Sequence, residues 1–329
     1  MEPASTARVA ITGIHHVTAF AGEAARHRRF YTDALGLDLV KRTVNFDAPT
    51  MWHLYYGLAG GAPGTLLTHF PGADGDGADA PPRTRLAGRE IGLVTMAVAP
   101  GTLGAVRDRL ASRGVAATTT TAFGREGLML VDPDGMALRI EEHARRQQPD
   151  AAAEVARVAL HVPDARETSA FLESVFGFRE TAREDRVLRL ALIEGDGEGD
   201  GEGGGEGHGD GGSGREIDVV HAPELRPAQI AAGSVHHVAW RVPDDAAQDA
   251  ARRALLAAGV AVTEVRDRQY FRSIYFRIPG GVLFEIATDG PGFAVDEPAG
   301  ALGRALRLPP QYEPRRADIA ARLPSLGDE

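Results

Sequence analysis

The sequence contains no cysteine among its 329 residues. Disulfides, thiolate nucleophiles and cysteine-based zinc sites are therefore excluded, and any bound metal ion must be held by His, Asp or Glu. Long apolar runs are lacking as well, because no segment reaches the roughly 18 apolar residues that a membrane-spanning helix needs. The N-terminus has no basic stretch followed by an apolar run, as a signal peptide would. We therefore expect a cytoplasmic protein with no membrane partner.

Basic residues are in deficit, with 36 Lys and Arg against 46 Asp and Glu, so the formal net charge is −10. This excess of acid disfavours a phosphate backbone as a partner, and we do not expect nucleic-acid binding. Six carboxylates and 12 glycines fall within residues 195–214. This composition predicts a solvated loop without packed structure.

A strand, a helix and then further strands recur four times along the chain, at intervals of about 70 to 80 residues. We call these copies modules one to four, and they predict an α+β fold of four βαβββ modules in a two-domain protein. Modules one and two fall within an N-terminal domain over residues 9–145. Modules three and four fall within a C-terminal domain over residues 153–290, which includes the acidic glycine loop, and residues 291–329 form a tail.

The repeats can be aligned without gaps at their first strands. VARVALHVPD of module three aligns with VHHVAWRVPD of module four, which places Arg157 at the position of His237. IHHVTAF of module one aligns with the same segment, so His16 is the equivalent of His237. Module two has Leu93 at this position, and His161 of module three is not equivalent to either histidine. Only modules one and four therefore keep histidine there.

One carboxylate joins the two histidines as a candidate metal ligand. Side chains alternate between the two faces of a strand, so Glu285 faces away from its apolar neighbours Phe284 and Ile286, which favour the core. If the sheets of modules one and four close into one cup, Glu285 converges with His16 and His237. Two imidazoles and one carboxylate form the facial triad of non-haem Fe(II) sites, which leaves three coordination positions open.

Four further residues are candidates near this cup. Alternation along SIYFRI directs Tyr275 toward it. Arg268 is one of several arginines in RDRQYFR, and the pattern leaves open whether it belongs to the site or to a solvated basic loop. His15 and His236 precede the two candidate ligands and lie on the opposite face if the strands are regular. The sequence leaves open whether they support the ligands or only pack.

Several segments resemble the hydroquinone-type ring-cleaving dioxygenases of the vicinal oxygen chelate superfamily, which also includes glyoxalase I and bleomycin-resistance proteins. They are GIHHVTAFAGE, FYTDALGLDLVKRTVNFD, HLYYG, PGTLLTHFP, VHHVAWRVPD, GGVLFEIATD and the tail segment LPPQYEPRR. The resemblance covers Gly13 to Pro324 except the acidic loop, and it implies modules paired into vicinal oxygen chelate cups. It implies His16, His237 and Glu285 as iron ligands, with His15, Thr18, His236, Arg268 and Tyr275 as catalytic residues around them.

The function implied by the resemblance is an Fe(II)-dependent, extradiol-type ring-cleaving dioxygenase that inserts both atoms of O2 into a hydroquinone-like aromatic. The expected partners are a small aromatic diol and O2, with Mn(II) as the alternative metal, and a homo-oligomer is compatible with the sequence. One alternative is a glyoxalase-type metal-dependent isomerase or lyase, which needs a second carboxylate that residues 61–72 of module one lack. The other is a metal-free drug-binding resistance protein.

Overall fold

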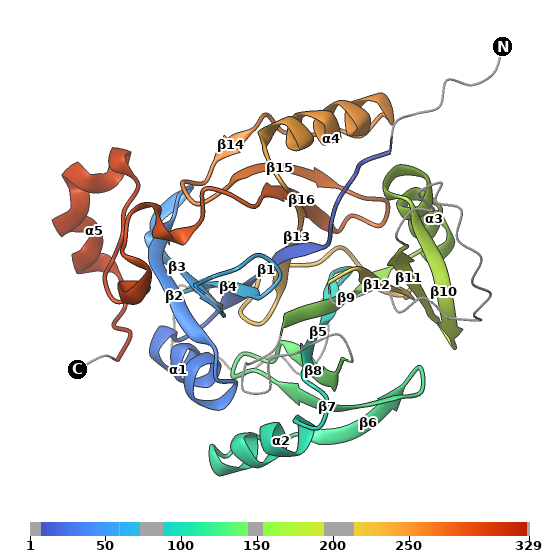
Figure 1. Cartoon of the computed structure of the whole chain (residues 1–329), viewed down its shortest axis with the longest axis horizontal. Coiled ribbons are helices and arrows are strands. Elements are labelled where there is room, and N and C mark those ends of the chain that lie inside the picture. Colours follow the sequence, from blue (N-terminus) through green and yellow to red (C-terminus); the bar gives the residue numbers. More distant parts are fainter. Residues whose placement is uncertain (1–7, 59, 73–87, 144–153, 194–213, 328–329) are drawn as a thin grey trace, which may run out of the picture.

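The computed structural model describes residues 8–58, 60–72, 88–143, 154–193 and 214–327. The predicted acidic glycine loop lies outside these residues except for Gly214. The predicted α+β fold class is confirmed, because each described module consists of a strand, a helix and three further strands (Figure 1). Within the same residues, no helix is both long and apolar enough to span a membrane.

The elements follow one another in the same order in each module. Module one has β1 (Ile14–Ala21), α1 (Ala24–Arg29), a π-helical turn (Phe30–Ala34), β2 (Asp38–Asn45), β3 (Ala48–Gly57) and β4 (Leu66–Pro71). Module two has β5 (Ile91–Val98), α2 (Leu103–Ser112), β6 (Thr118–Ala122), β7 (Arg125–Val131) and β8 (Ala137–Glu142). Module three has β9 (Glu154–Val162), α3 (Ala165–Phe171), a π-helical turn (Leu172–Phe176), β10 (Phe178–Glu184), β11 (Val187–Leu192) and β12 (Glu216–His221). Module four has β13 (Val235–Val242), α4 (Asp245–Ala257), β14 (Arg266–Asp267), β15 (Arg272–Arg277) and β16 (Leu283–Thr288).

These strands form two curled, eight-stranded sheets across the described residues (Figure 1). The first sheet joins module four to module one through an antiparallel pair of β13 and β1. The second joins module two to module three through the equivalent pair of β5 and β9. The domain boundaries at 9–145 and 153–290 follow chain order and remain a prediction, whereas each sheet combines modules from both predicted domains.

Strand alternation separates an apolar face from a hollow face in the first sheet. Val17, Val238 and Phe284 are at most 1% exposed and belong to the main apolar core. Helix α4 covers this face, where the Gln248 side-chain amide donates to the carbonyl oxygen of Ile286 at 2.9 Å. Residues one position along each strand consequently face the interior of the curled sheet.

The C-terminal tail returns to module one, as the red helix α5 (Arg316–Arg322) beside β2 and β3 shows in Figure 1. Trp52 of β3 donates its indole N–H to the carbonyl oxygen of Pro324 at 2.8 Å. The buried Lys41 ammonium of β2 lies 2.6 Å from a carboxylate oxygen of Asp296 and also pairs with Glu297. The tail therefore packs against the strands that form one wall of the first sheet's interior. It also contains three short 3-10 helices, at Phe293–Val295, Ala299–Ala301 and Pro310–Arg315.

Candidate metal centre

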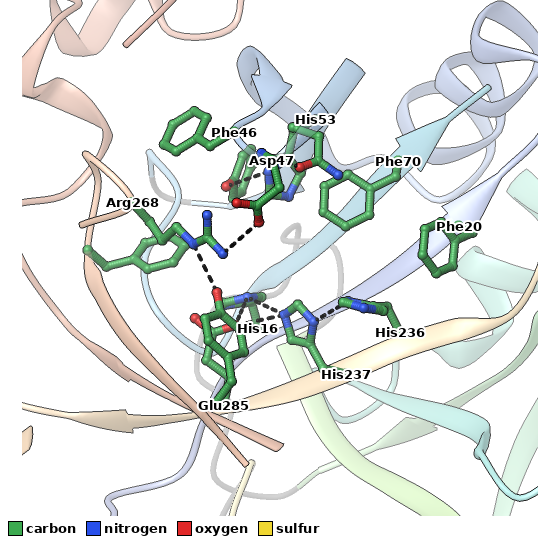
Figure 2. Close-up of a pocket in the computed structure, with 14 residues that line it drawn as sticks. His16, Phe20, Phe46, Asp47, His53, Phe70, His236, His237, Arg268 and Glu285 are labelled. Carbon is green, nitrogen blue, oxygen red and sulfur yellow. Dashed lines mark hydrogen bonds and ion pairs between the residues drawn. The ribbon is translucent and has the colours of Figure 1, made fainter. Parts of the chain in front are cut away.

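Three donor side chains from three strands meet inside the first sheet (Figure 2). His16 comes from β1, His237 from β13 and Glu285 from β16, and they are 1%, 4% and 0% exposed. The two Nε2 atoms lie 3.2 Å apart. Oε2 of Glu285 lies 2.8 Å from Nε2 of His237 and 3.5 Å from Nε2 of His16. The three residues proposed from the sequence as ligands are therefore brought together.

The spacing of these donor atoms matches one face of a metal coordination octahedron. Two donors bound at about 2.1 Å and at a right angle to each other would lie about 3.0 Å apart. The three observed separations, from 2.8 to 3.5 Å, surround that value. Burying a carboxylate against two imidazoles in this way is costly without a counter-charge, and a divalent cation supplies one.

The histidine pairs sit at β-bulges, which changes the predicted orientation of His15 and His236. The register between β1 and β13 shifts at two places. Between Ile14 and His16, His15 is an extra residue on β1. At the second shift, His236 is an extra residue on β13. A bulge re-aims a side chain that a regular strand would send to the opposite face. The predicted opposite-face placement is therefore wrong for His236, which lines the same cavity as His237.

At each bulge, the first histidine of the pair lies within hydrogen-bonding distance of the second. Nδ1 of His15 lies 2.9 Å from Nδ1 of His16, and Nδ1 of His236 lies 2.8 Å from Nδ1 of His237. Such a hydrogen bond fixes the ring orientation and leaves Nε2 of His16 and His237 free to bind a cation. His15 packs behind the site, with its ring centroid 5.0 Å from that of Phe271.

The electrostatics of the site favour an ionised Glu285 beside a neutral His237. Burial alone would raise the pKa of Glu285, but His16 and His237 outweigh it and hold that pKa well below its ordinary value. The Ser273 hydroxyl also donates to Glu285. Burial, followed by the neighbouring His237, lowers the pKa of His236 to about 3. Burial also lowers the pKa of His237, so His236 and His237 are unprotonated near pH 7, and a neutral imidazole can act as a metal ligand.

The donors open onto a cavity of about 250 Å³. Tyr275 lines it, as strand alternation predicts, and Arg268 lines it, as the resemblance implies. Nε of Arg268 donates to Oη of Tyr275 at 3.1 Å. Arg268 also donates to Asp47, in the turn between β2 and β3, at 3.1 Å (Figure 2). Burial raises the pKa of Tyr275 well above its ordinary value, so its hydroxyl stays protonated. Aromatic walls complete the cavity, and they are Phe20, Phe46, Phe70 and Phe271.

A chain of hydrogen bonds on module one includes His53 and Tyr55, which line the cavity. Tyr55 Oη lies 2.9 Å from Nδ1 of His53, and Nε2 of His53 lies 2.9 Å from Oγ1 of Thr68. Thr68 in turn lies 2.8 Å from Thr18, which therefore reaches the cavity only through Thr68 and His53. Alternation along HLYYG puts His53 and Tyr55 on one face, which is the signal that identifies them.

The second sheet has no histidine at the equivalent positions of its described strands. Strand register places Asp218 of β12 beside Ala159, as Glu285 of β16 lies beside Ala239. The equivalents of the three donors are therefore Leu93, Arg157 and Asp218. Nε of Arg157 lies 3.0 Å from Oδ2 of Asp218. A guanidinium thus stands beside the carboxylate in this sheet, where an imidazole stands in the first.

The repeat, the curled sheets and the buried donors around a cavity define a protein of paired βαβββ modules. Residues 13–140 and 154–286 match the model of the Glyoxalase/Bleomycin resistance protein/Dioxygenase superfamily. The chain belongs to this superfamily, as its resemblance to vicinal oxygen chelate proteins implied.

The chain is also similar to individual proteins over most of its length. "Putative ring-cleaving dioxygenase MhqO" of Bacillus subtilis is 37% identical, over 93% of this chain and 94% of that protein. "Chlorohydroquinone/hydroquinone 1,2-dioxygenase" of Sphingobium indicum is 31% identical, over 92% of this chain and 93% of that protein. A crystal structure of a "putative dioxygenase" from Bacillus subtilis is similar with a TM-score of 0.85 and 35% identity, over 98% of this chain and 99% of the other.

Proposed function

We propose that the protein is a ring-cleaving dioxygenase that uses Fe(II) and inserts both atoms of O2 into a hydroquinone-like aromatic, by extradiol-type chemistry. The observation that carries this proposal is the convergence of His16, His237 and Glu285 with the spacing of an octahedral face. The names of the similar proteins, which include a hydroquinone 1,2-dioxygenase, support the reaction class.

The donor set fits Fe(II), and Mn(II) is the alternative. Two imidazoles and one carboxylate on one face favour octahedral first-row ions and leave three positions for other ligands. A bound Fe(II) would act as a Lewis acid that favours the phenolate form of the substrate and would carry electrons from the substrate to O2. The hydrogen bonds from His15 and His236 hold the imidazole rings of His16 and His237 in the orientation that metal binding requires.

The cavity residues have complementary tasks. The phenylalanine walls take the apolar ring and exclude water from it. His236 lines the cavity, and because its Nδ1 accepts the Nδ1–H of a metal-bound His237, its Nε2–H can donate a hydrogen bond to a substrate oxygen. A para-diol binds a metal through one oxygen, so its distal hydroxyl needs partners from the protein. Arg268, Tyr275 and His53 line the cavity with polar groups that can hold it.

The glyoxalase-type alternative needs a second carboxylate ligand from module one, and the residue at that position is a threonine. Register places Thr68 beside Thr18 in module one, as Glu285 lies beside Ala239 in module four. Thr68 is therefore the equivalent of Glu285, and its hydroxyl already bonds to Thr18 and His53. A metal-free binding protein is not favoured either, because it gains nothing from three buried donors aimed at one another. The predicted cytoplasmic location stays a prediction.

The reaction is tested with metal-stripped protein reloaded anaerobically with Fe(II), Mn(II) or Zn(II). With Fe(II), hydroquinone should drive the uptake of one O2 per ring opened, and isotopically labelled O2 should place both oxygen atoms in the product. Zn(II) cannot supply electrons, so it should give no uptake. Incorporation of no labelled oxygen, or ring chemistry supported by Zn(II), would refute the dioxygenase assignment.

Substrate choice is tested separately on the same iron-loaded preparation. We expect kcat/KM to be higher for hydroquinone and methylhydroquinone than for catechol, because removing the para hydroxyl leaves buried polar partners in the cavity unpaired. A clear preference for catechol would overturn the hydroquinone assignment and leave the dioxygenase assignment standing.

A further inference from the structure

A second group of metal-binding side chains lies outside the cavity. His27 comes from α1, His69 from β4, and Asp132 from the turn between β7 and β8. Their donor atoms lie within 4.8 Å of one another, and the residues are 0%, 0% and 3% exposed. Alternation along β4 directs Thr68 to the cavity and His69 to the opposite face. This cluster is therefore separate from the candidate metal centre and lies between modules one and two.

The imidazoles of this cluster have unmet hydrogen-bonding capacity. Neither ring nitrogen of His27 and neither ring nitrogen of His69 has a hydrogen-bond partner among the described residues. The nearest contact of His27 is an ion-pair distance of 3.5 Å between its Nε2 and Oδ2 of Asp132. Leaving a buried donor or acceptor unpaired costs about 1–3 kcal/mol. Such a cluster is therefore expensive unless another group satisfies it.

The carboxylate of the cluster is held in place by its own turn. Oδ1 of Asp132 accepts the backbone N–H groups of Asp134 at 2.9 Å and Met136 at 2.8 Å. Oδ2 is left facing the histidines, and it accepts the hydroxyl of Tyr31 at 3.1 Å. Backbone N–H groups thus hold Oδ1 in place, and Oδ2 faces the two histidines. Carboxylates that bind metal ions are commonly held by hydrogen bonds in this way.

The repeat provides an internal comparison for this corner of the molecule. The same alignment identifies the equivalent corner between modules three and four, where a helix packs against β12 and the turn before β16. The residues at the three donor positions there are Thr168, Val219 and Ile278, which are 0%, 0% and 3% exposed. The fold therefore closes this corner with one hydroxyl and two aliphatic side chains. Packing alone does not require two histidines and an aspartate at the other corner.

We infer that His27, His69 and Asp132 form a second, buried metal site for a divalent transition ion such as zinc. Imidazole and carboxylate donors suit zinc, and tetrahedral bonds of about 2.1 Å separate donors by about 3.4 Å. The 3.5 Å between His27 and Asp132 fits that value, and the donor atoms of all three residues lie within 4.8 Å of one another. The Tyr31 hydroxyl donates to Oδ2 of Asp132 and so supports the carboxylate as a ligand. The ion would tie α1 and β4 to the turn of module two.

The test uses the full-length chain with His16→Ala and Glu285→Gln, which disable the candidate metal centre. After chelation, incubation with Zn(II) and gel filtration, this chain should retain about one zinc ion. Adding His69→Val, the residue of the equivalent corner, or Asp132→Asn, which keeps the turn's acceptor oxygen, should lower retained zinc at least tenfold. The control is His161→Gln, which removes a histidine of module three and should change nothing. Circular dichroism establishes that each variant is folded.

A second readout separates zinc binding from a merely structural role of these residues. Zinc that binds only the folded chain raises Tm by mass action, so Zn(II) should raise Tm in the parent variant and fail to do so after His69→Val or Asp132→Asn. The inference is overturned if the parent variant retains no zinc, or if the folded His69→Val and Asp132→Asn chains retain as much as their parent. Neither result depends on the proposed dioxygenase activity.

Discussion

Replacing Arg157 by methionine should strongly destabilise the second sheet. The Arg157 guanidinium is buried, and its Nη1 lies 2.7 Å from Glu216 and 3.0 Å from Glu141. Its Nε lies 3.0 Å from Asp218. Arg157→Met keeps the aliphatic stem but leaves three buried carboxylates without their common cation. Breaking a buried ion pair from one side costs about 3–5 kcal/mol of unfolding free energy.

The pKa of Glu141 gives a second measure of this effect. Burial would raise that pKa, but Arg157 leads the groups that lower it from 4.5 to about 2. This difference, to which Arg139 also contributes and which Arg157→Met therefore removes only in part, corresponds to about 3 kcal/mol in favour of the folded state. Because the folded pKa is the lower one, the stabilisation is present above pH 4.5 and is lost as the pH falls toward 2. The deficit of Arg157→Met should therefore be largest near pH 7 and shrink in acid.

Urea unfolding followed by circular dichroism at pH 7 and at several lower pH values measures this deficit. The matched control is Arg183→Met, which removes an exposed guanidinium that pairs with Glu180 and should change the unfolding free energy little. A deficit under about 1 kcal/mol for Arg157→Met, or one that is constant with pH, would refute the reasoning.

Two further substitutions probe the cavity and the tail. Arg268→Gln should lower kcat/KM for hydroquinone about tenfold to a hundredfold, because the cavity wall that also contains Tyr275 loses a charged hydrogen bond worth about 1.5–3 kcal/mol. Steady-state oxygen uptake measures this change in kcat/KM. An unchanged value would exclude Arg268 from substrate binding. Lys41→Met should cost about 3–5 kcal/mol in urea unfolding, because it leaves the buried Glu297 without its ammonium partner. A loss below about 1 kcal/mol would mean that the tail is held by its other contacts.

The repeat and the donor positions could be predicted from the sequence because they depend on local pattern. Strand alternation and two HH pairs at equivalent places were sufficient to single out His16 and His237. The orientation of His236 could not be predicted, because a bulge is set by the pairing of β1 with β13, which are more than 200 residues apart. Parity arguments assume a regular strand, and the two bulges break that assumption.

Residues that act through tertiary neighbours were also beyond the sequence. Thr68 is identified as the equivalent of Glu285 only once the register of β4 with β1 is known. His27, His69 and Asp132 are far apart in the chain and follow no spacing that is typical of a metal site, so only folding brings them together. The sequence also assigns modules to domains by chain order, whereas the sheets join module one to four and module two to three.

The most direct test of the proposed metal centre is hydroquinone-dependent oxygen uptake by Fe(II)-loaded variants of its three donors. His16→Ala, His237→Ala and Glu285→Gln should each lose nearly all uptake, because a site with three protein ligands has no spare anchor. His161→Gln, on the other sheet, should keep the rate of the unmodified chain. Wild-type uptake in any folded donor variant, or its loss in His161→Gln, would contradict the assignment of iron to this site.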